Sequence, residues 1–166
     1  MILTKEFLHT LYEYESGYLI SKQKRGPATI GKKIVTKHKD GYISTTINRK
    51  RFYVHRLIYM MFHGELPRFI DHIDGNRANN KIQNLRPATE SQNNVNSKGR
   101  SKSGYKNIYF DPRKNHYLVV LIINRKKNFF GCFKDLELAC LVAEEARNKY
   151  HGEFANHGYK GTKKII

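Results

Sequence analysis

The pattern of apolar and polar positions in the first third of the chain predicts one short helix followed by strands. Between residues 4 and 14, the apolar side chains of Phe7, Leu8 and Leu11 recur at helical spacing. After Gly17 the pattern becomes extended, with β-forming residues grouped between turn residues. We therefore expect strands at Tyr18–Ile20, Lys33–Val35, Tyr42–Ile47 and Arg51–Val54.

Helical spacing returns in the middle of the chain. It predicts a helix over Val54–Phe62 that Gly64 and Pro67 end. A short apolar run follows, and then residues 89–92 (Thr-Glu-Ser-Gln) fit a capping box for a short helix to about Ser97. The apolar side of the first of these helices comprises Val54, Leu57, Ile58, Met61 and Phe62.

The pattern in the last third of the chain predicts a small module of three strands and one helix. Strands are expected at 108–110, 117–123 and 128–133, and Asp135 can cap a helix that runs to about Tyr150. One stripe of this helix carries Leu136, Ala139, Cys140, Ala143 and Ala146.

These elements predict an α+β protein built from separate pieces. The main boundary is expected in the small, polar, basic segment that begins at Ser97. The expected pieces are an N-terminal helix with a basic antiparallel β-ribbon (1–53), a central core (54–97), a linker (98–104), the sheet-and-helix module (105–157) and a basic tail (158–166).

The net charge of the chain indicates which class of binding partner to expect. The 166 residues include 31 Lys or Arg against 14 Asp or Glu, which gives a net charge of +17 and a pI near 9.9. Such an excess favours a polyanion. A membrane surface is disfavoured, because the sequence has no run of about 18 apolar residues and no basic amphipathic helix stands out.

The compartment is expected to be intracellular. Residues 1–10 lack the layout of a secretion signal. The two cysteines, Cys132 and Cys140, are too few for a zinc site or a disulfide framework, so we expect both to be small core residues in a reducing setting. The expected localisation is cytoplasmic.

Basic residues are concentrated in two segments. Residues 22–56 hold 11 Lys or Arg and one acid, and residues 97–127 hold nine and one acid. In the first segment they are interleaved with β-formers, which indicates a ribbon against a phosphate backbone; a solvated hairpin is the alternative. The expected contacts there are Arg25, Lys32, Lys33, Arg49, Lys50 and Arg51.

The candidate chemistry lies between the two basic segments, where Asp71 and His72 end an apolar run. Hydrolysis of a phosphodiester needs an activated water and neutralised charge, which a histidine and a divalent cation can supply. Such cations prefer oxygen ligands like those of Asp71 and Asn93. Because adjacent strand residues point to opposite faces, Asp71 and His72 can share a site only if the strand ends or bulges there, and the turn at residues 74–75 favours an early end.

An ordered set of motifs in this region resembles the HNH nucleases of the phage and intron homing-endonuclease branch. The motifs are Val54-His55-Arg56-Leu57, Asp71-His72-Ile73-Asp74-Gly75-Asn76, Asn79-Asn80, Asn84-Leu85-Arg86 and Asn93. The resemblance implies a ββα-metal fold with His72 as general base and Asp71 as metal ligand. It implies that Asn84 braces the loop and that Asn93, where many members carry histidine, is the second metal ligand, with Asn94 and Asn96 as alternatives in register.

The resemblance also implies the cofactor, one divalent cation, with Mg²⁺ preferred over Mn²⁺. The other motif residues leave alternatives open. Packing or a phosphate contact is favoured over catalysis for His55. Arg56 and Arg86 are either phosphate clamps or solvated charges.

The last third of the chain resembles AP2 domains, through residues 103–108, the strands that follow, and the helix ending in Tyr150-His151-Gly152-Glu153-Phe154-Ala155. The resemblance implies a three-stranded sheet in the DNA major groove. The outward face departs from that family, since it would carry Tyr109, Leu118, Val120, Ile122 and Phe129, which favours thymine methyl contacts or a protein interface. Phosphate contacts are expected from Arg113, Lys114, Arg125, Lys126 and Lys127.

Together these features predict a metal-dependent HNH endonuclease of the homing type that acts as a monomer on double-stranded DNA. A non-catalytic DNA-binding protein with a degenerate nuclease core is the first alternative. An RNA-binding protein is the second, disfavoured because no RNA-binding glycine-aromatic motif is present. For the last module, a purely structural role is also open.

Overall fold

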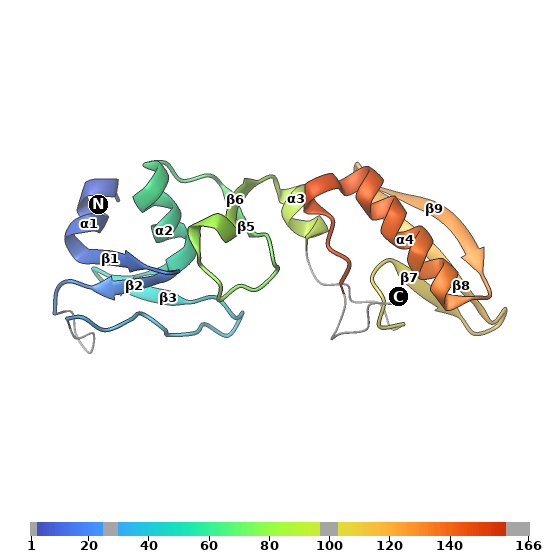
Figure 1. Cartoon of the computed structure of the whole chain (residues 1–166), viewed down its shortest axis with the longest axis horizontal. Coiled ribbons are helices and arrows are strands. Elements are labelled where there is room, and N and C mark those ends of the chain that lie inside the picture. Colours follow the sequence, from blue (N-terminus) through green and yellow to red (C-terminus); the bar gives the residue numbers. More distant parts are fainter. Residues whose placement is uncertain (1–2, 25–29, 97–102, 159–166) are drawn as a thin grey trace. The chain divides into compact units, whose positions relative to one another are not determined.

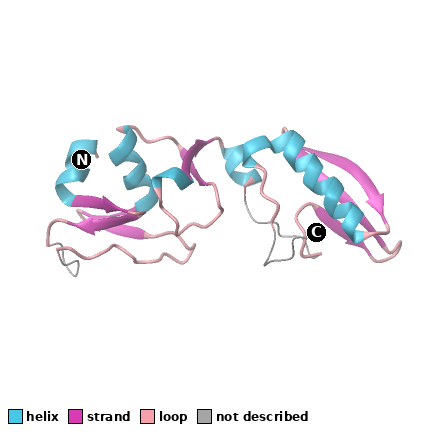
Figure 2. Cartoon of the chain, viewed as in Figure 1, coloured by secondary structure: helices cyan, strands magenta, loops and turns pink. Residues whose placement is uncertain are grey.

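The computed structural model describes residues 3–24, 30–96 and 103–158, which form small sheets and short helices (Figures 1 and 2). These residues fall into two compact units divided between Ala88 and Thr89, and each is described by itself. None of the helices in the described ranges is long and apolar enough to span a bilayer.

The first unit combines three two-stranded antiparallel sheets with helices, within the residues described. Its sheets are β1–β2, β3–β4 and β5–β6. Its elements are α1 (Lys5–Leu11), β1 (Tyr12–Glu15), β2 (Tyr18–Ser21), β3 (Ser44–Ile47), β4 (Lys50–Tyr53), α2 (Val54–His63), β5 (Phe69–His72), the 3-10 turn η1 (Ile82–Asn84) and β6 (Leu85–Ala88).

The N-terminal expectation needs two corrections. The helix expected to reach Tyr14 ends at Leu11, because β1 begins at Tyr12 and pairs with β2 through a tight turn in which Gly17 has φ +93°. A Cβ on Gly17 would lie 2.8 Å from the backbone nitrogen of Lys81, so the turn needs glycine. Lys33 makes only an isolated bridge to β2, and the expected ribbon is therefore two separate hairpins.

The core of the first unit lies between α1, α2 and the first two hairpins. Figure 1 shows α1 and α2 on the same side of β1 and β2. Buried leucines of both helices, Leu8, Leu11 and Leu57, meet in this core. Phe62, expected on the buried side of α2, is instead 43% exposed and packs edge-on against Tyr14, because it lies in the last turn of the helix, next to the end of the core.

The third hairpin carries the candidate chemistry. β5 pairs antiparallel with β6, and His72, its last residue, lies opposite Leu85. The strand ends at His72, just before the turn at residues 74–75, and a site shared by Asp71 and His72 stays a prediction. The predicted capping box is confirmed, since Thr89 and Gln92 form both of its hydrogen bonds at the start of α3 (Glu90–Val95). Because α3 belongs to the second unit, the complete ββα-metal arrangement stays a prediction.

The second unit contains α3 and the module of three strands and one helix. The sheet order is β7 (Ile108–Asp111), β8 (His116–Ile123), β9 (Lys126–Phe133), all antiparallel. The long helix α4 (Leu136–His151) lies along one face of this sheet, followed by the 3-10 turn η2 (Gly152–Phe154) (Figure 1). These elements have the expected order; the resemblance to AP2 domains stays a prediction.

Small side chains let α4 approach the sheet closely. Its predicted stripe is confirmed, since Ala139, Cys140, Ala143 and Ala146 are buried against Ile108, Val119 and Leu121. The expectation for Cys132 is wrong: this residue is exposed. Cys132 lies in β9, opposite Leu118 of β8 and just after a register shift. Its side chain therefore lies on the face that α4 does not cover.

Candidate functional site

His72 is enclosed, and its Nε2 lies at hydrogen-bond distance from an asparagine side chain. It is 4% exposed, and its Nε2 lies 3.1 Å from Oδ1 of Asn80, which is itself 2% exposed. Because an amide oxygen only accepts, the neutral imidazole must carry its proton on Nε2. Nδ1 is then the nitrogen with the lone pair, which is the nitrogen able to take a proton.

Three aromatic rings from other elements form a wall beside His72. The ring of His55, in the first turn of α2, meets that of His72 edge-on at 5.0 Å between centroids. Tyr42 lies 5.7 Å from His72 and 4.9 Å from His55, and Tyr53 stacks on His55 at 5.7 Å. This wall removes the histidines from water.

Burial has a clear effect on both imidazoles. It lowers the pKa of His72, against the opposing effects of the Asn80 hydrogen bond and the charges of Asp74 and Asp71. Burial, with the charges of His72 and Arg56, lowers the pKa of His55 to about 3. Among the described residues His55 Nδ1 has no hydrogen-bond partner. Both rings are therefore neutral at neutral pH.

Asp71 is held by an arginine on the neighbouring strand. Its Oδ2 accepts from Nε of Arg86 at 2.9 Å and lies 2.8 Å from Nη2 of the same guanidinium. The Asp71 side chain is 4% exposed and that of Arg86 is 12% exposed. The two residues are directly opposite in the β5–β6 register, which places them on one face of the hairpin. The sequence analysis missed this pair, because its only signal is the register.

Asn84 spans the loop between the two strands. Its Nδ2 donates to Oδ1 of Asp74 (2.9 Å) and to the carbonyl of Asn79 (2.8 Å), and its Oδ1 accepts from the amide of Asp74 (3.0 Å). Asn79 donates in turn to Asp74 Oδ2 at 2.7 Å. Burial opposes ionisation of Asp74, but the hydrogen bonds from Asn79, the Asn76 amide and Asn84 lower its pKa. A short carboxylate–amide network thus fixes the chain that follows His72.

A second set of contacts fixes the loop that presents Tyr42. Asp40 accepts a hydrogen bond from the Tyr53 hydroxyl at 2.8 Å, and His38 Nδ1 lies 2.8 Å from its other oxygen. Burial acts to raise the pKa of Asp40, but the contacts with Tyr53, His38 and the Tyr42 amide lower it to about 2. Arg77 donates to the Asp40 carbonyl at 2.9 Å and lies over the ring of Tyr42.

Sequence reasoning gave no role to Asn80, Tyr42, Tyr53 or Asp40. The doublet Asn79-Asn80 was part of the motif, so Asn80 had a signal. The tyrosines and Asp40 come from the preceding loop and hairpin, and no local pattern relates them to His72.

The predicted second metal ligand lies on another element. Asn93 is in α3, within the second unit, whereas Asp71, His72 and Asn84 are in the first. The role of Asn93 stays a prediction. Of the alternatives in register, Asn96 has a structural role, because its carbonyl and Oδ1 both accept from Nδ2 of Asn156.

Most of the predicted DNA-contacting side chains are exposed, and the two described ones that are not exposed make hydrogen bonds within the protein. Arg56 donates to the carbonyls of Arg68 and Pro67, which fixes the segment after α2, and Arg86 is paired with Asp71. Lys33 pairs with Glu15 at 3.4 Å on the surface, and Arg25 lies outside the described residues. The others are exposed: Lys32, Arg49, Lys50, Arg51, Arg113, Lys114, Arg125, Lys126 and Lys127.

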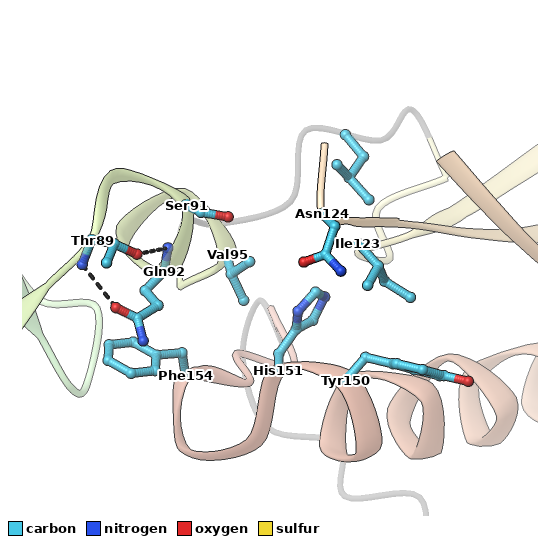
Figure 3. A pocket seen from close by; sticks show the side chains of 10 residues that line it. Thr89, Ser91, Gln92, Val95, Ile123, Asn124, Tyr150, His151 and Phe154 are labelled. Carbon is cyan, nitrogen blue, oxygen red and sulfur yellow. Dashed lines mark hydrogen bonds between the residues drawn. The ribbon is translucent and has the colours of Figure 1, made fainter. Parts of the chain in front are cut away.

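A hollow of about 310 Å³ lies in the second unit, between α3, the end of β8 and the end of α4 (Figure 3). Figure 3 shows Asn124 and His151 pointing toward one another across it. None of the predicted site residues lines it. Its lining comprises Thr89, Ser91, Gln92, Val95, Ile122, Ile123, Asn124, Tyr150, His151 and Phe154.

Three curated proteins resemble this chain. The "SPbeta prophage-derived putative HNH homing endonuclease YosQ" of Bacillus subtilis is 34% identical over 86 residues, 49% of this chain and 48% of that protein. The "Uncharacterized HNH endonuclease L560" of Acanthamoeba polyphaga mimivirus is 31% identical over 70% of this chain and 62% of that protein. "Protein 3.8" of Escherichia phage T7 is 29% identical over 64% of this chain and 93% of that protein.

The chain therefore spans about half the length of the first of these relatives and less than two thirds of the second. No solved structure matches it. Residues 52–95 match the family model described as HNH endonuclease, and this segment contains α2, the β5–β6 hairpin with His72 and Asn84, and α3. The family match thus supports the predicted resemblance to HNH nucleases over residues 52–95.

Proposed function

We propose that the chain is a divalent-metal-dependent DNA endonuclease of the HNH homing type. His72 is the general base, Asp71 and Asn93 bind the cation, and Asn84 braces the loop. The observation that carries this proposal is the setting of His72: a neutral imidazole, held by Asn80 through Nε2, at the end of β5 in the HNH segment.

The chain's own groups supply the proton transfer. A water molecule that attacks a phosphodiester must lose a proton, and we assign its acceptance to Nδ1 of His72, the ring nitrogen that does not face Asn80. Burial keeps the ring neutral and therefore able to accept at neutral pH. The ring wall of Tyr42 and His55 holds the imidazole in one plane, so little reorganisation is needed when the proton moves.

The oxygen donors fit a hard divalent cation. Asp71 offers a carboxylate and Asn93 an amide oxygen, the ligand types that Mg²⁺ and Mn²⁺ accept. When bound, such an ion supplies charge neutralisation at the phosphoryl group and the departing 3′ oxygen. The guanidinium of Arg86 now neutralises Asp71, so the carboxylate must exchange one positive partner for another.

Charge supports double-stranded DNA as the substrate. The net charge is +17. Exposed basic side chains lie in or next to the β3–β4 turn of the first unit and both turns of the three-stranded sheet of the second. We assign phosphate contacts to these side chains and an AP2-like DNA-binding role to the second unit. A monomer with two binding units would cover a long site.

Cleavage of supercoiled plasmid DNA by the full chain tests this function, with Mg²⁺ in one arm and EDTA in the other. We expect cutting only with Mg²⁺, and a loss of about 10²–10⁴-fold in the His72→Ala variant. The matched control is His63→Ala, since His63 is an exposed histidine of the same unit. Cutting by His72→Ala at the parental rate would refute the assignment of the base.

One observation favours a second candidate, a DNA-binding protein with a degenerate nuclease core. Asp71 is only 4% exposed and is paired with Arg86, and His72 is also only 4% exposed. If this arrangement were permanent, neither group could reach a phosphate. Salt-sensitive DNA binding without cutting, in Mg²⁺ and in Mn²⁺ alike, would establish this candidate.

A further inference from the structure

The second unit presents an apolar sheet face that α4 does not cover. Three of its side chains are well exposed: Tyr109 at 51%, Ile122 at 58% and Phe129 at 63%. Strand register makes the face continuous, because Tyr109 lies opposite Leu118, and Val120 lies opposite Phe129. We name these five residues the sheet patch. Cys132, opposite Leu118, is exposed at its edge.

Charge is distributed unequally between the two sides of this unit. Residues 103–134, which contain the sheet and its turns, hold seven Lys or Arg and one acid, Asp111. Residues 135–153, which contain α4, hold five acids and two basic residues. Asp111 is also engaged, since its carboxylate accepts from the Arg113 amide and lies 3.6 Å from the Arg113 guanidinium. An apolar face framed by positive turns complements a polyanion that has apolar groups at its centre.

The DNA major groove has that character when the sequence is rich in thymine. The C5-methyl of thymine is the apolar group that base pairs display there, between two rows of phosphates. The sheet patch offers Ile122 and Phe129 for methyl contacts, whereas the exposed lysines and arginines lie at the ends of its strands: Arg113, Lys114, Arg125, Lys126 and Lys127.

From this geometry we infer that the sheet patch is a specificity determinant that reads C5-methyl groups in the major groove. Its preferred duplexes are therefore rich in thymine at the positions under the sheet. The inference rests on the proposed DNA-binding function and deepens it, because it names what the second unit discriminates. Apolar contacts, rather than hydrogen bonds to base edges, supply the discrimination.

Synthetic duplexes that differ only in the methyl group test this inference. The full chain is titrated in EDTA, so that no cutting occurs, against alternating dA·dT and dA·dU polymers, and against dG·dC polymers with cytosine or 5-methylcytosine. We expect tighter binding to the methylated member of both pairs, by about fourfold for each methyl that is buried.

Matched variants locate the effect. The double variant Ile122→Ala/Phe129→Ala should lose the methyl preference but keep the parental salt dependence. The control Leu138→Ala/Leu141→Ala changes two exposed apolar residues of α4, 48% and 61% exposed, and should keep both. A second measurement needs no variant: the dA·dT polymer should slow alkylation of Cys132, the exposed thiol, relative to protein without DNA.

The remaining outcomes overturn the inference in different ways. Equal, salt-sensitive binding to all four polymers would remove the methyl-reading role and leave the proposed function intact. Self-association that the sheet variant abolishes, without methyl preference, would make the patch a protein interface. If no polymer bound in a salt-sensitive manner, the proposed function itself would fail, and this inference with it.

Discussion

The first unit buries three ionisable side chains around the candidate site, with His55 5% exposed and Asp71 and His72 each 4% exposed, whereas the second unit exposes Tyr109, Ile122 and Phe129 by half or more. These three ionisable side chains lie inside the first unit, and these three apolar side chains lie on the surface of the second. Each arrangement costs folding free energy, because buried charges lose water and exposed rings are not used in a core. The compensation must come from another interaction, which suggests chemistry for the first unit and a partner for the second.

The largest expected effect concerns the buried ion pair. Arg86→Met leaves the carboxylate of Asp71 buried without its charge partner, so the unfolding free energy of the first unit should fall by about 3–5 kcal/mol without divalent ions. Urea denaturation measures this. Mg²⁺ should stabilise this variant more than the parent, because Asp71 no longer has a competing cation.

The matched change in the second unit is Arg113→Met. Its side chain is 88% exposed, and its Nε lies 3.6 Å from Asp111 Oδ1, so the cost should be within about 1 kcal/mol. Equal costs for the two variants would contradict the contrast between the units. A Mg²⁺ response that is the same in Arg86→Met and the parent would remove Asp71 as a metal ligand.

The next effect concerns the contact that fixes the tautomer of His72. Asn80→Ala should lower kcat for DNA cleavage by about 10–100-fold and leave KM nearly unchanged, because the imidazole loses the acceptor that holds its Nε2 proton. Asn80→Asp retains an acceptor and should recover much of the rate. Asn148→Ala, an exposed position on α4, should act as wild type. A rise in KM with kcat unchanged would argue against a positioning role.

Near neutral pH, a smaller effect on stability should follow from the burial of His55. The folded-state pKa of His55 is about 3, below its ordinary value of 6.5, so between these limits the unfolded chain binds more protons than the native one. Stability is therefore complete above about pH 6.5 and is lost as the pH falls toward 3, by up to about 1.4 kcal/mol per pH unit. His55→Gln should flatten this dependence, measured as unfolding free energy against pH; the exposed His63→Gln should not.

The smallest effect should come from the turns of the sheet. Lys126→Gln/Lys127→Gln should weaken DNA binding several-fold and lower the slope of log K against log salt by about one for each phosphate that the variant no longer neutralises. The single-turnover cleavage rate at saturating protein should not change, because these residues belong to the second unit, whereas the proposed base, His72, belongs to the first. Lys149→Gln, on α4, is the control, and an equal change of slope there would show that only net charge matters.

The sequence was sufficient where one period or one motif governs a segment. The stripe of α4 and the Thr89–Gln92 capping box needed only local spacing. Prediction from the sequence was wrong where two patterns compete. Tyr12 fits the apolar side of a helix as well as a strand, and its pairing with Ser21 places it in a strand. Cys132 was misplaced because its exposure depends on a register shift in β9.

The residues of the candidate site also fall into two groups: those that a local motif predicts and those that only packing brings together. Asp71, His72 and Asn84 were found because they lie in one ordered motif. The contact from Arg86 to Asp71 depends on strand register, and the ring wall joins Tyr42, Tyr53 and His55, which precede His72 by 17 residues or more. Contacts of this kind are set by packing between distant segments, and no local spacing encodes them.

The most direct test is a structure of the full chain bound to duplex DNA with Ca²⁺ in place of Mg²⁺, so that the strand is not cut. We expect a cation about 2.3–2.6 Å from a carboxylate oxygen of Asp71, with Arg86 displaced and a phosphate beside Nδ1 of His72. Asp71 still paired with Arg86, and no phosphate within reach of His72, would contradict this mechanism.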